Sequence, residues 1–311
     1  MSPKASSPQL ETQGPAALPK VYSATRDRAI CWSRERRGVG VRDRRTCCER
    51  VVVSAPWTGR STWWWVVVSA GMDADTAALA EAIDTELQAG GSAQRAEKEQ
   101  SYLKSMLRHY GTSVPSIRAA VKRTARRFPG MTHEQLVALV EVLWAEPVHE
   151  RRMACVELLD LYRDWLGPAD IVLLERLVRE SRTWALVDGL AVSVVGRLVE
   201  RHSEVIAVLD RWAGDDDFWM RRSAMLALLA PLRQGRGDFD RFGRYADAML
   251  DEREFFVRKA IGWVLRDTGR KRPDLVFEWL LPRASRASGV TIREAVKPLS
   301  SAQRDAIDGA R

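Results

Sequence analysis

The 311-residue sequence predicts an all-α protein whose helices stack in pairs as a curved α-solenoid with one concave face. Three observations support this fold class. Apolar residues recur at spacings of three and four residues through most of the chain after residue 72. Short breakers divide that part into segments of about 12–16 residues, and no alternating strand pattern of useful length occurs. In such a stack, function is expected where side chains of successive helices meet on the concave face.

The helical periodicity is clearest in three consecutive segments, 136–144, 153–161 and 171–178. Asp215, Asp216 and Asp217 are candidates to cap the helix that follows them, because a short polar side chain there accepts a hydrogen bond from the first turn. The breakers lie at 128–130, 147, 167–168, 214–217 and 235–237.

The charge of the chain is divided unevenly between two parts. Lys and Arg number 49 against 41 Asp and Glu, but residues 1–71 hold 12 of these cations and 5 of these acids, which leaves 37 against 36 in residues 72–311. The basic character is therefore no evidence of a nucleic-acid surface on the helical part, and such a claim needs a local basic face. The four cysteines form no CxxC pair, and the uncharged stretch 61–72 is too short to cross a membrane.

Residues 1–71 show no sustained helical or strand periodicity. We interpret them as a dispensable, largely disordered upstream extension, with Met72 as the natural start of a single domain over residues 72–311. A DNA-binding arm is the alternative, because the stretch 26–50 is strongly basic.

Two helices carry cations that the core does not need. In the segment 115–128, Arg118, Lys122 and Arg126 share one face, and no acid occurs between residues 111 and 132 to pair with them. In the segment 254–267, Lys259 and Arg266 lie one turn before and after Trp263. A solvated face and a half-buried tryptophan covered by alkyl stems are the structural interpretations. The functional interpretation is a set of phosphate contacts around an aromatic platform.

The segment 184–199 places Trp184 and Asp188 on the same helix face, and no cation lies one turn from Asp188. This carboxylate either favours the positive end of its helix or serves an active site. In the segment 218–224, Trp219 is expected in the core, and Arg222 is either a surface charge or a cation that faces a ligand. The four histidines have no metal-ligand spacing and no nucleotide-binding loop occurs, so neither a metal nor a cofactor is expected.

Several of these segments resemble the DNA alkylation repair family, and more narrowly the AlkD-like DNA glycosylases, which consist of HEAT-like helical repeats. The most specific segment is EFFVRKAIGWVLR (254–266). The similarity covers nearly all of residues 95–300 in the same order. The shorter segments are QSYLK (100–104), LWAEPVHER (143–151), WALVD (184–188), WMRRSA (219–224) and TIREAVK (291–297).

The resemblance implies a function and a site. Members of this family hydrolyse the N-glycosidic bond of cationic N3- and N7-alkylated purines in double-stranded DNA, which binds in the concave groove. Asp188 matches the family's catalytic aspartate, Trp184 and Trp263 match the rings that contact the lesion, and Arg222 matches an arginine at the DNA backbone. The sequence departs from the family at Thr183 and Ala185, where an aromatic residue and an acid are frequent.

The resemblance further implies a base-excision repair enzyme of the cytoplasm, associated with the nucleoid and active as a monomer, and no cofactor or metal is expected. Lys259, Arg266, Arg118, Lys122 and Arg126 are then the expected backbone-binding cations. Two alternatives remain at this stage. A non-catalytic relative would bind DNA without releasing a base, and a protein scaffold would have negligible affinity for DNA even at low salt.

Overall fold

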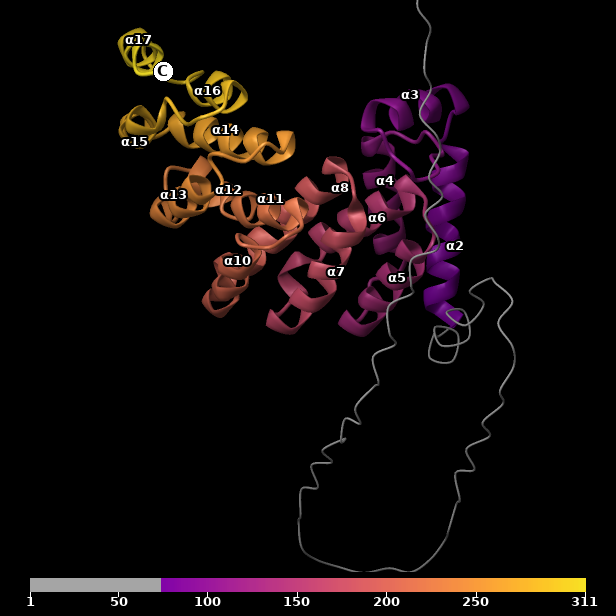
Figure 1. Ribbon diagram of the computed structural model, residues 1–311. Helices are drawn as coiled ribbons and strands as arrows, with labels where there is room; N and C mark the ends of the chain where they lie inside the picture. The colour runs from indigo at the N-terminus through magenta and orange to yellow at the C-terminus, as the bar shows by residue number, and fades with distance from the viewer. Residues whose placement is uncertain (1–73) are drawn as a thin grey trace, which may run out of the picture. The chain divides into compact units, whose positions relative to one another are not determined.

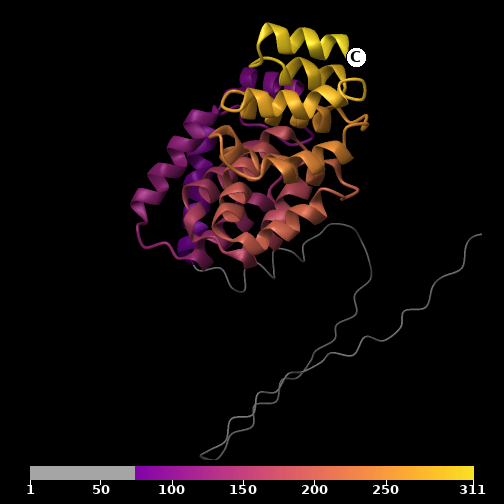
Figure 2. The same cartoon turned by 90° about the vertical axis from the view of Figure 1, so that its left-hand side faces the viewer.

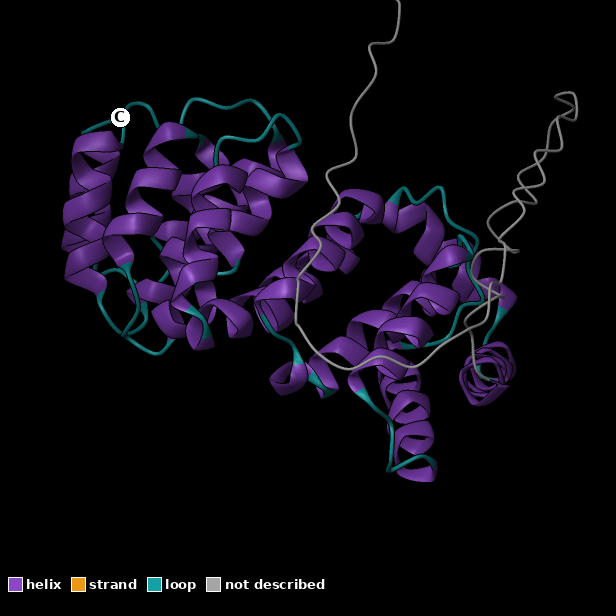
Figure 3. Cartoon of the chain, turned by 90° about the horizontal axis from the view of Figure 1, so that it is seen from below, coloured by secondary structure: helices purple, strands orange, loops and turns teal. Residues whose placement is uncertain are grey.

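The computed structural model describes residues 74–311. The interpretation of residues 1–71 as a disordered extension lies outside the described residues. Within the described part every regular element is a helix, and the single backbone bridge, between Arg108 and Val148, is too short to form a strand (Figure 3). The predicted all-α stack of helical repeats is confirmed.

The helices follow one another with short connections (Figure 1). The first group comprises α2 (Ala74–Ala89), α3 (Ala93–Leu103), α4 (Val114–Arg127), α5 (His133–Ala145), α6 (His149–Leu161) and α7 (Ile171–Ser181). The next comprises α8 (Trp184–Gly189), the π-helical η3 (Leu190–Val195), α9 (Gly196–Arg201), α10 (Ile206–Trp212), α11 (Phe218–Leu226) and α12 (Leu229–Arg233). The last comprises α13 (Phe239–Ala248), α14 (Phe255–Gly269), α15 (Pro273–Leu280), α16 (Gly289–Ala295) and α17 (Ser301–Gly309).

The local signals in the sequence account for these boundaries. The segments with clear periodicity became α5, α6 and α7. Asp217 is the N-cap of α11, where its side chain accepts a hydrogen bond from the Trp219 N–H. Thr132 and Gln135 form a capping box at the start of α5. None of the helices between residues 74 and 311 combines the length and the apolar composition that a bilayer crossing requires.

Helices of successive repeats pack on one another in chain order. Helix α4 packs on α6, α11 packs on α14, and α14 packs on α16 (Figures 1 and 2). One continuous apolar core follows from this stacking, and it extends from Leu79 to Ile307. Trp219 belongs to this core with 7% of its surface exposed, as the sequence predicted.

Eight of the ion pairs between helices of the described part recur at a nearly constant spacing. Their partners lie 34 to 39 residues apart, which is the length of one helix pair with its connections. Equivalent positions of neighbouring repeats therefore face each other with opposite charge. The pairs are Glu86 with Arg123, Arg118 with Glu157, Glu141 with Arg176, Glu175 with Arg211, Asp188 with Arg222, Arg233 with Asp267, Asp247 with Arg283, and Lys259 with Glu294.

Candidate active site

Asp188 and Trp184 lie on α8, which continues without a break into the π-helical η3. A π-helical turn widens the backbone locally and is frequent at functional sites. Gly189, between Asp188 and this turn, allows a close approach to α6, because a Cβ atom there would lie 2.7 Å from Val156 Cγ1. Two local features, the glycine and the π-turn, therefore determine where the Asp188 carboxylate sits.

The Asp188 carboxylate is held by the guanidinium of Arg222 from α11. The Nε and Nη2 atoms of Arg222 donate to Oδ1 and Oδ2 of Asp188, at 2.7 Å each. Its Nη1 atom donates to the Phe256 carbonyl of α14 at 2.5 Å. One guanidinium therefore joins three helices at this point, in the planar two-bond geometry that arginine forms best with carboxylates.

Two expectations from the sequence are wrong here. Asp188 is not unpaired, because its partner comes from the next repeat, 34 residues away, rather than from its own helix. Arg222 is not displayed as a surface cation, because only 3% of it is exposed and the ring of Phe256 lies 5.9 Å from its guanidinium carbon. Arg222 therefore positions the carboxylate, and its buried charge is already neutralised.

The electrostatics of Asp188 combine two opposing effects. Burial raises the pKa of Asp188 above its ordinary value, and the hydrogen bonds and charge of Arg222 offset only part of that rise. The side chain keeps 16% of its surface exposed. Since each carboxylate oxygen has two lone pairs and Arg222 uses one on each, the others remain able to accept a hydrogen bond from water or a substrate.

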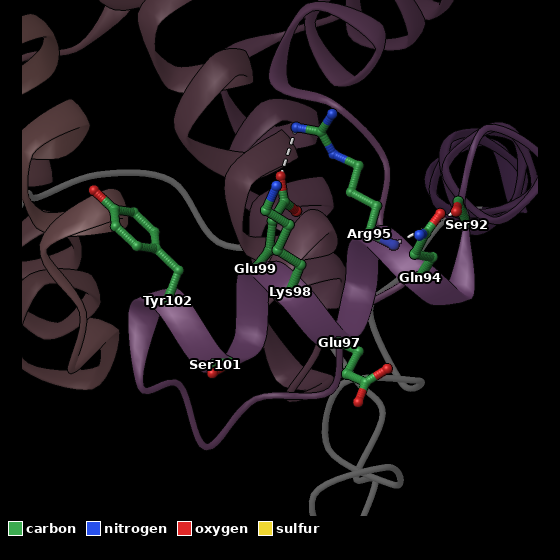
Figure 4. A pocket seen from close by; sticks show the side chains of 8 residues that line it. All are labelled: Ser92, Gln94, Arg95, Glu97, Lys98, Glu99, Ser101 and Tyr102. Atoms are coloured by element: carbon green, nitrogen blue, oxygen red, sulfur yellow. Dashed lines mark hydrogen bonds and ion pairs between the residues drawn. The ribbon is translucent and has the colours of Figure 1, made fainter.

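Trp184 is half-buried and forms an aromatic contact that the sequence analysis did not anticipate. Its ring meets that of Tyr102 edge to face, with centroids 6.0 Å apart and planes at 87°. Tyr102 stands at the end of α3 with 73% of its surface exposed (Figure 4). No side chain of α3 is buried, and its visible ion pair joins Arg95 to Glu99 (Figure 4). An aromatic residue on a helix without an apolar face was the signal that could have indicated Tyr102.

A cavity of about 370 Å³ lies beside these two rings. Its α8 wall consists of Trp184, Ala185 and Gly189, the residues on either side of Asp188 along the helix. Its other walls come from α3, α4 and α6, and they include the apolar Ile117 and the charged Glu157. The cavity thus combines aromatic and apolar surfaces with the carboxylate of Glu157, which is paired with Arg118, another residue of the cavity wall.

Trp263 lies on α14, two turns after Phe256, and it is half-buried as the structural interpretation expected. Its Nε1–H donates to Oδ2 of Asp267 at 3.1 Å. The sequence predicted that the flanking cations would contact phosphate, but in the structure both are paired. Lys259 and Arg266 bind Glu294 of α16, with Lys259 Nζ 2.6 Å from Oε1. The role of Trp263 at a lesion therefore stays a prediction.

The basic face of α4 is also partly neutralised. Both carboxylate oxygens of Glu157 accept hydrogen bonds from Arg118, each at 2.7 Å. The expectation of a fully uncompensated stripe is wrong, because the compensating acids come from neighbouring helices. Lys122 and Arg126 are exposed and have no ion-pair partner between residues 74 and 311.

Glu99, His109 and Glu150 form the one group in the described part with at least three side chains whose ligand atoms lie within 4.8 Å of one another. The oxygens of Glu150 accept hydrogen bonds from the backbone N–H groups of Tyr110, Gly111 and Thr112. Glu99 pairs with Arg95. Both carboxylates thus already accept hydrogen bonds or an ion pair within the protein, which limits the lone pairs left for a metal ion.

Comparison with known proteins identifies the family of this chain. The profile of the family described as DNA alkylation repair enzyme matches residues 83–299. No curated protein matches the chain. A solved structure of a predicted DNA alkylation repair enzyme from Enterococcus faecalis is 23% identical, covers 68% of this chain and 97% of its own, and superimposes with a TM-score of 0.62. AlkD2 from Streptococcus mutans is 18% identical over 67% of this chain and 99% of its own, with a TM-score of 0.49.

Proposed function

This chain belongs to the DNA alkylation repair enzyme family, and on that premise we propose that it is a DNA glycosylase for cationic N3- and N7-alkylated purines in duplex DNA. The single observation that carries the proposal is the Asp188 carboxylate, which is held rigidly on the same helix face as Trp184. Double-stranded DNA with alkylated purines is the proposed partner, and a monomer in the cytoplasm, at the nucleoid, is the proposed working form.

The chemistry needs few groups. An N3- or N7-alkylated purine is cationic and leaves as a neutral base, so no general acid has to protonate it. Positive charge then develops at the sugar C1′, as in the oxocarbenium-like transition state of glycoside hydrolysis. Asp188 stabilises that charge and accepts a hydrogen bond from the attacking water through a lone pair that Arg222 does not use. The positive charge of Arg222 offsets the negative charge of the Asp188 carboxylate, and its two hydrogen bonds hold that carboxylate in one orientation.

Selectivity for a charged lesion would come from the rings. The face of a tryptophan attracts a cation by about 0.5–2 kcal/mol, and this attraction grows as water is excluded. Trp184 is half-buried against Tyr102, so its ring is fixed and partly desolvated before any DNA binds. A neutral purine would gain less at the same place.

The first test is Asp188→Asn assayed on methylated duplex DNA. Release of 7-methylguanine should fall about a hundredfold, as expected when a preorganised electrostatic group is lost. Binding to the same duplex should persist. The Asn carbonyl accepts one bond from Arg222 but its NH2 group cannot accept the other, so the variant should be less stable, and thermal unfolding checks that it is folded at the assay temperature. Release at the wild-type rate would refute the role of Asp188.

A second candidate function has one observation in its favour. Because Arg222 already pairs with both oxygens of Asp188, the chain could bind alkylated DNA without cleaving the glycosidic bond. The departures from the family at Thr183 and Ala185, one residue on either side of Trp184, point the same way. A base-release assay on wild-type protein separates the two, since a pure binding protein would shift the duplex in a gel and release no base.

A further inference from the structure

Two residues have an unusual backbone conformation next to the aromatic pair. Among the described residues, Lys104 and Arg182 are the only non-glycine positions with positive φ, at 49° and 47°. Each ends a helix: Lys104 caps α3, and Arg182 caps α7. Side chains with a Cβ atom adopt this conformation at a cost, and glycine or asparagine is usual at such a cap. At both caps this chain has a cation instead.

Along the chain, each cap is two residues away from one of the two rings. Lys104 follows Tyr102 by two residues, and Arg182 precedes Trp184 by two residues. Since the rings of Tyr102 and Trp184 are 6.0 Å apart, both cationic caps are anchored close to the same point.

The side chains of these caps line one cavity of about 330 Å³ together with Arg152 of α6. Lys104 and Arg182 are exposed, and neither has an ion-pair partner in residues 74–311. Arg152 uses Nη1 for a hydrogen bond to the Glu180 carbonyl at 2.9 Å, and its buried Nε has no partner there. The Glu180 carboxylate, which also borders the cavity, accepts from the indole N–H of Trp144 and is paired with Arg176.

The cavity thus brings unpaired cations together next to the aromatic pair, whereas several other candidate phosphate-binding cations are neutralised. Arg118, Lys259 and Arg266, the cations that the sequence offered for phosphate contacts, all have acidic partners. Lys104 and Arg182 have none among the described residues, and guanidinium groups suit the oxygens of a phosphate in a planar, two-bond geometry.

We propose that Lys104, Arg152 and Arg182 bind a phosphodiester group of the DNA backbone beside the nucleotide that contacts Trp184 and Tyr102. That the bound phosphate belongs to DNA rests on the proposed function. That a phosphate binds here is argued from the cavity and its unpaired cations. Phosphate contacts of this kind set the register of a protein on a duplex without reading its sequence. The site would therefore place a lesion against the rings.

The test compares two double variants that remove the same charge. Lys104→Gln with Arg182→Gln removes both cationic caps and keeps side chains of similar length. Arg270→Gln with Arg304→Gln is the control, because both residues are exposed and also lack ion-pair partners in the described part. The full chain is titrated with an undamaged duplex over a series of salt concentrations, and thermal unfolding checks that each variant is folded.

The cap variant should lose about one unit of salt slope for each cation removed, and its affinity should fall about tenfold or more at low salt. The control pair should keep the wild-type slope. Equal slopes in all three proteins, or an equal loss in the control, would overturn the proposal.

The outcomes also separate this site from the enzyme activity. If wild-type protein releases methylated purines while the cap variant keeps the full salt slope, only the phosphate site fails. If the slope falls in the cap variant and the wild-type protein releases no base, the phosphate site stands and the glycosylase proposal fails. An absence of duplex binding by wild-type protein at low salt overturns the phosphate site.

Discussion

Two carboxylates of this protein, Asp188 and Glu294, are built alike and behave in opposite ways. Both face cations of an adjacent repeat, and only 16% and 10% of their side-chain surfaces are exposed, but Asp188 lies deeper in the protein than Glu294. Asp188 has one cationic partner, Arg222, whereas Glu294 has three, Lys259, Arg266 and Lys297.

The pKa values of the two groups differ in direction. Burial raises the pKa of Asp188, and a single guanidinium offsets only part of the rise. Burial also acts to raise the pKa of Glu294, but the hydrogen bonds and charges of its cations outweigh it and lower the pKa to about 2. Asp188 lies deeper in the protein and has one cationic partner, whereas Glu294 lies nearer the surface and has three, so burial depth and the number of cations together decide the sign of the pKa shift. Glu294 joins α14 to α16 through several cations, while Asp188 is joined to α11 by one guanidinium.

The largest expected effect is that of Arg222→Ala. This variant leaves Asp188 largely buried without its cation, and breaking such a pair costs about 3–5 kcal/mol of unfolding free energy. Denaturant unfolding at neutral pH measures it. Arg197→Ala is the control, because Arg197 and its partner Asp164 are 43% and 60% exposed, so the loss of this pair should cost less than about 1 kcal/mol. Equal losses in the two variants would show that burial does not distinguish these pairs.

The next largest effect is the loss of the stability that Glu294 contributes when the pH is lowered. Its folded pKa is about 2 against an ordinary value of 4.5, so its stabilising contribution is present above about pH 4.5 and is lost as the pH falls toward 2. Glu294→Gln should therefore be less stable than wild type at pH 7 by about 2–3 kcal/mol. The gap should close across that acid window, as followed by denaturant unfolding at several pH values. A gap that stays constant with pH would contradict the lowered pKa.

The smallest effect is the pH dependence of Asp188→Asn, which should have the opposite sign. Because the folded pKa of Asp188 is raised, its ionisation costs stability as the pH rises through its titration range. The stability of wild-type protein relative to Asp188→Asn should thus increase as the pH is lowered into that range. The same series of unfolding curves provides the measurement, and a change parallel to that of Glu294→Gln would refute the comparison.

Much of the architecture was predictable because it depends on local patterns. Apolar spacing located α5, α6 and α7, and the run of aspartates located the start of α11. The same local reasoning placed Trp184 and Asp188 on one helix face, since residues four apart in an α-helix are neighbours. The charge partners were not predictable in this way. Arg222 for Asp188 and Glu294 for Lys259 come from the next repeat, 34 and 35 residues away.

Local patterns in the sequence were enough to predict that the part after residue 72 is mainly helical, where several helices break, and which charged side chains lie outside the core. The sequence could not indicate which of these charges remain free, because the stacking of the repeats brings the acids of one repeat against the bases of the next. A cation is available to a ligand only when no carboxylate has already paired with it. That stacking neutralised Arg222, Lys259 and Arg266 and left Lys104 and Arg182 beside the rings of Tyr102 and Trp184.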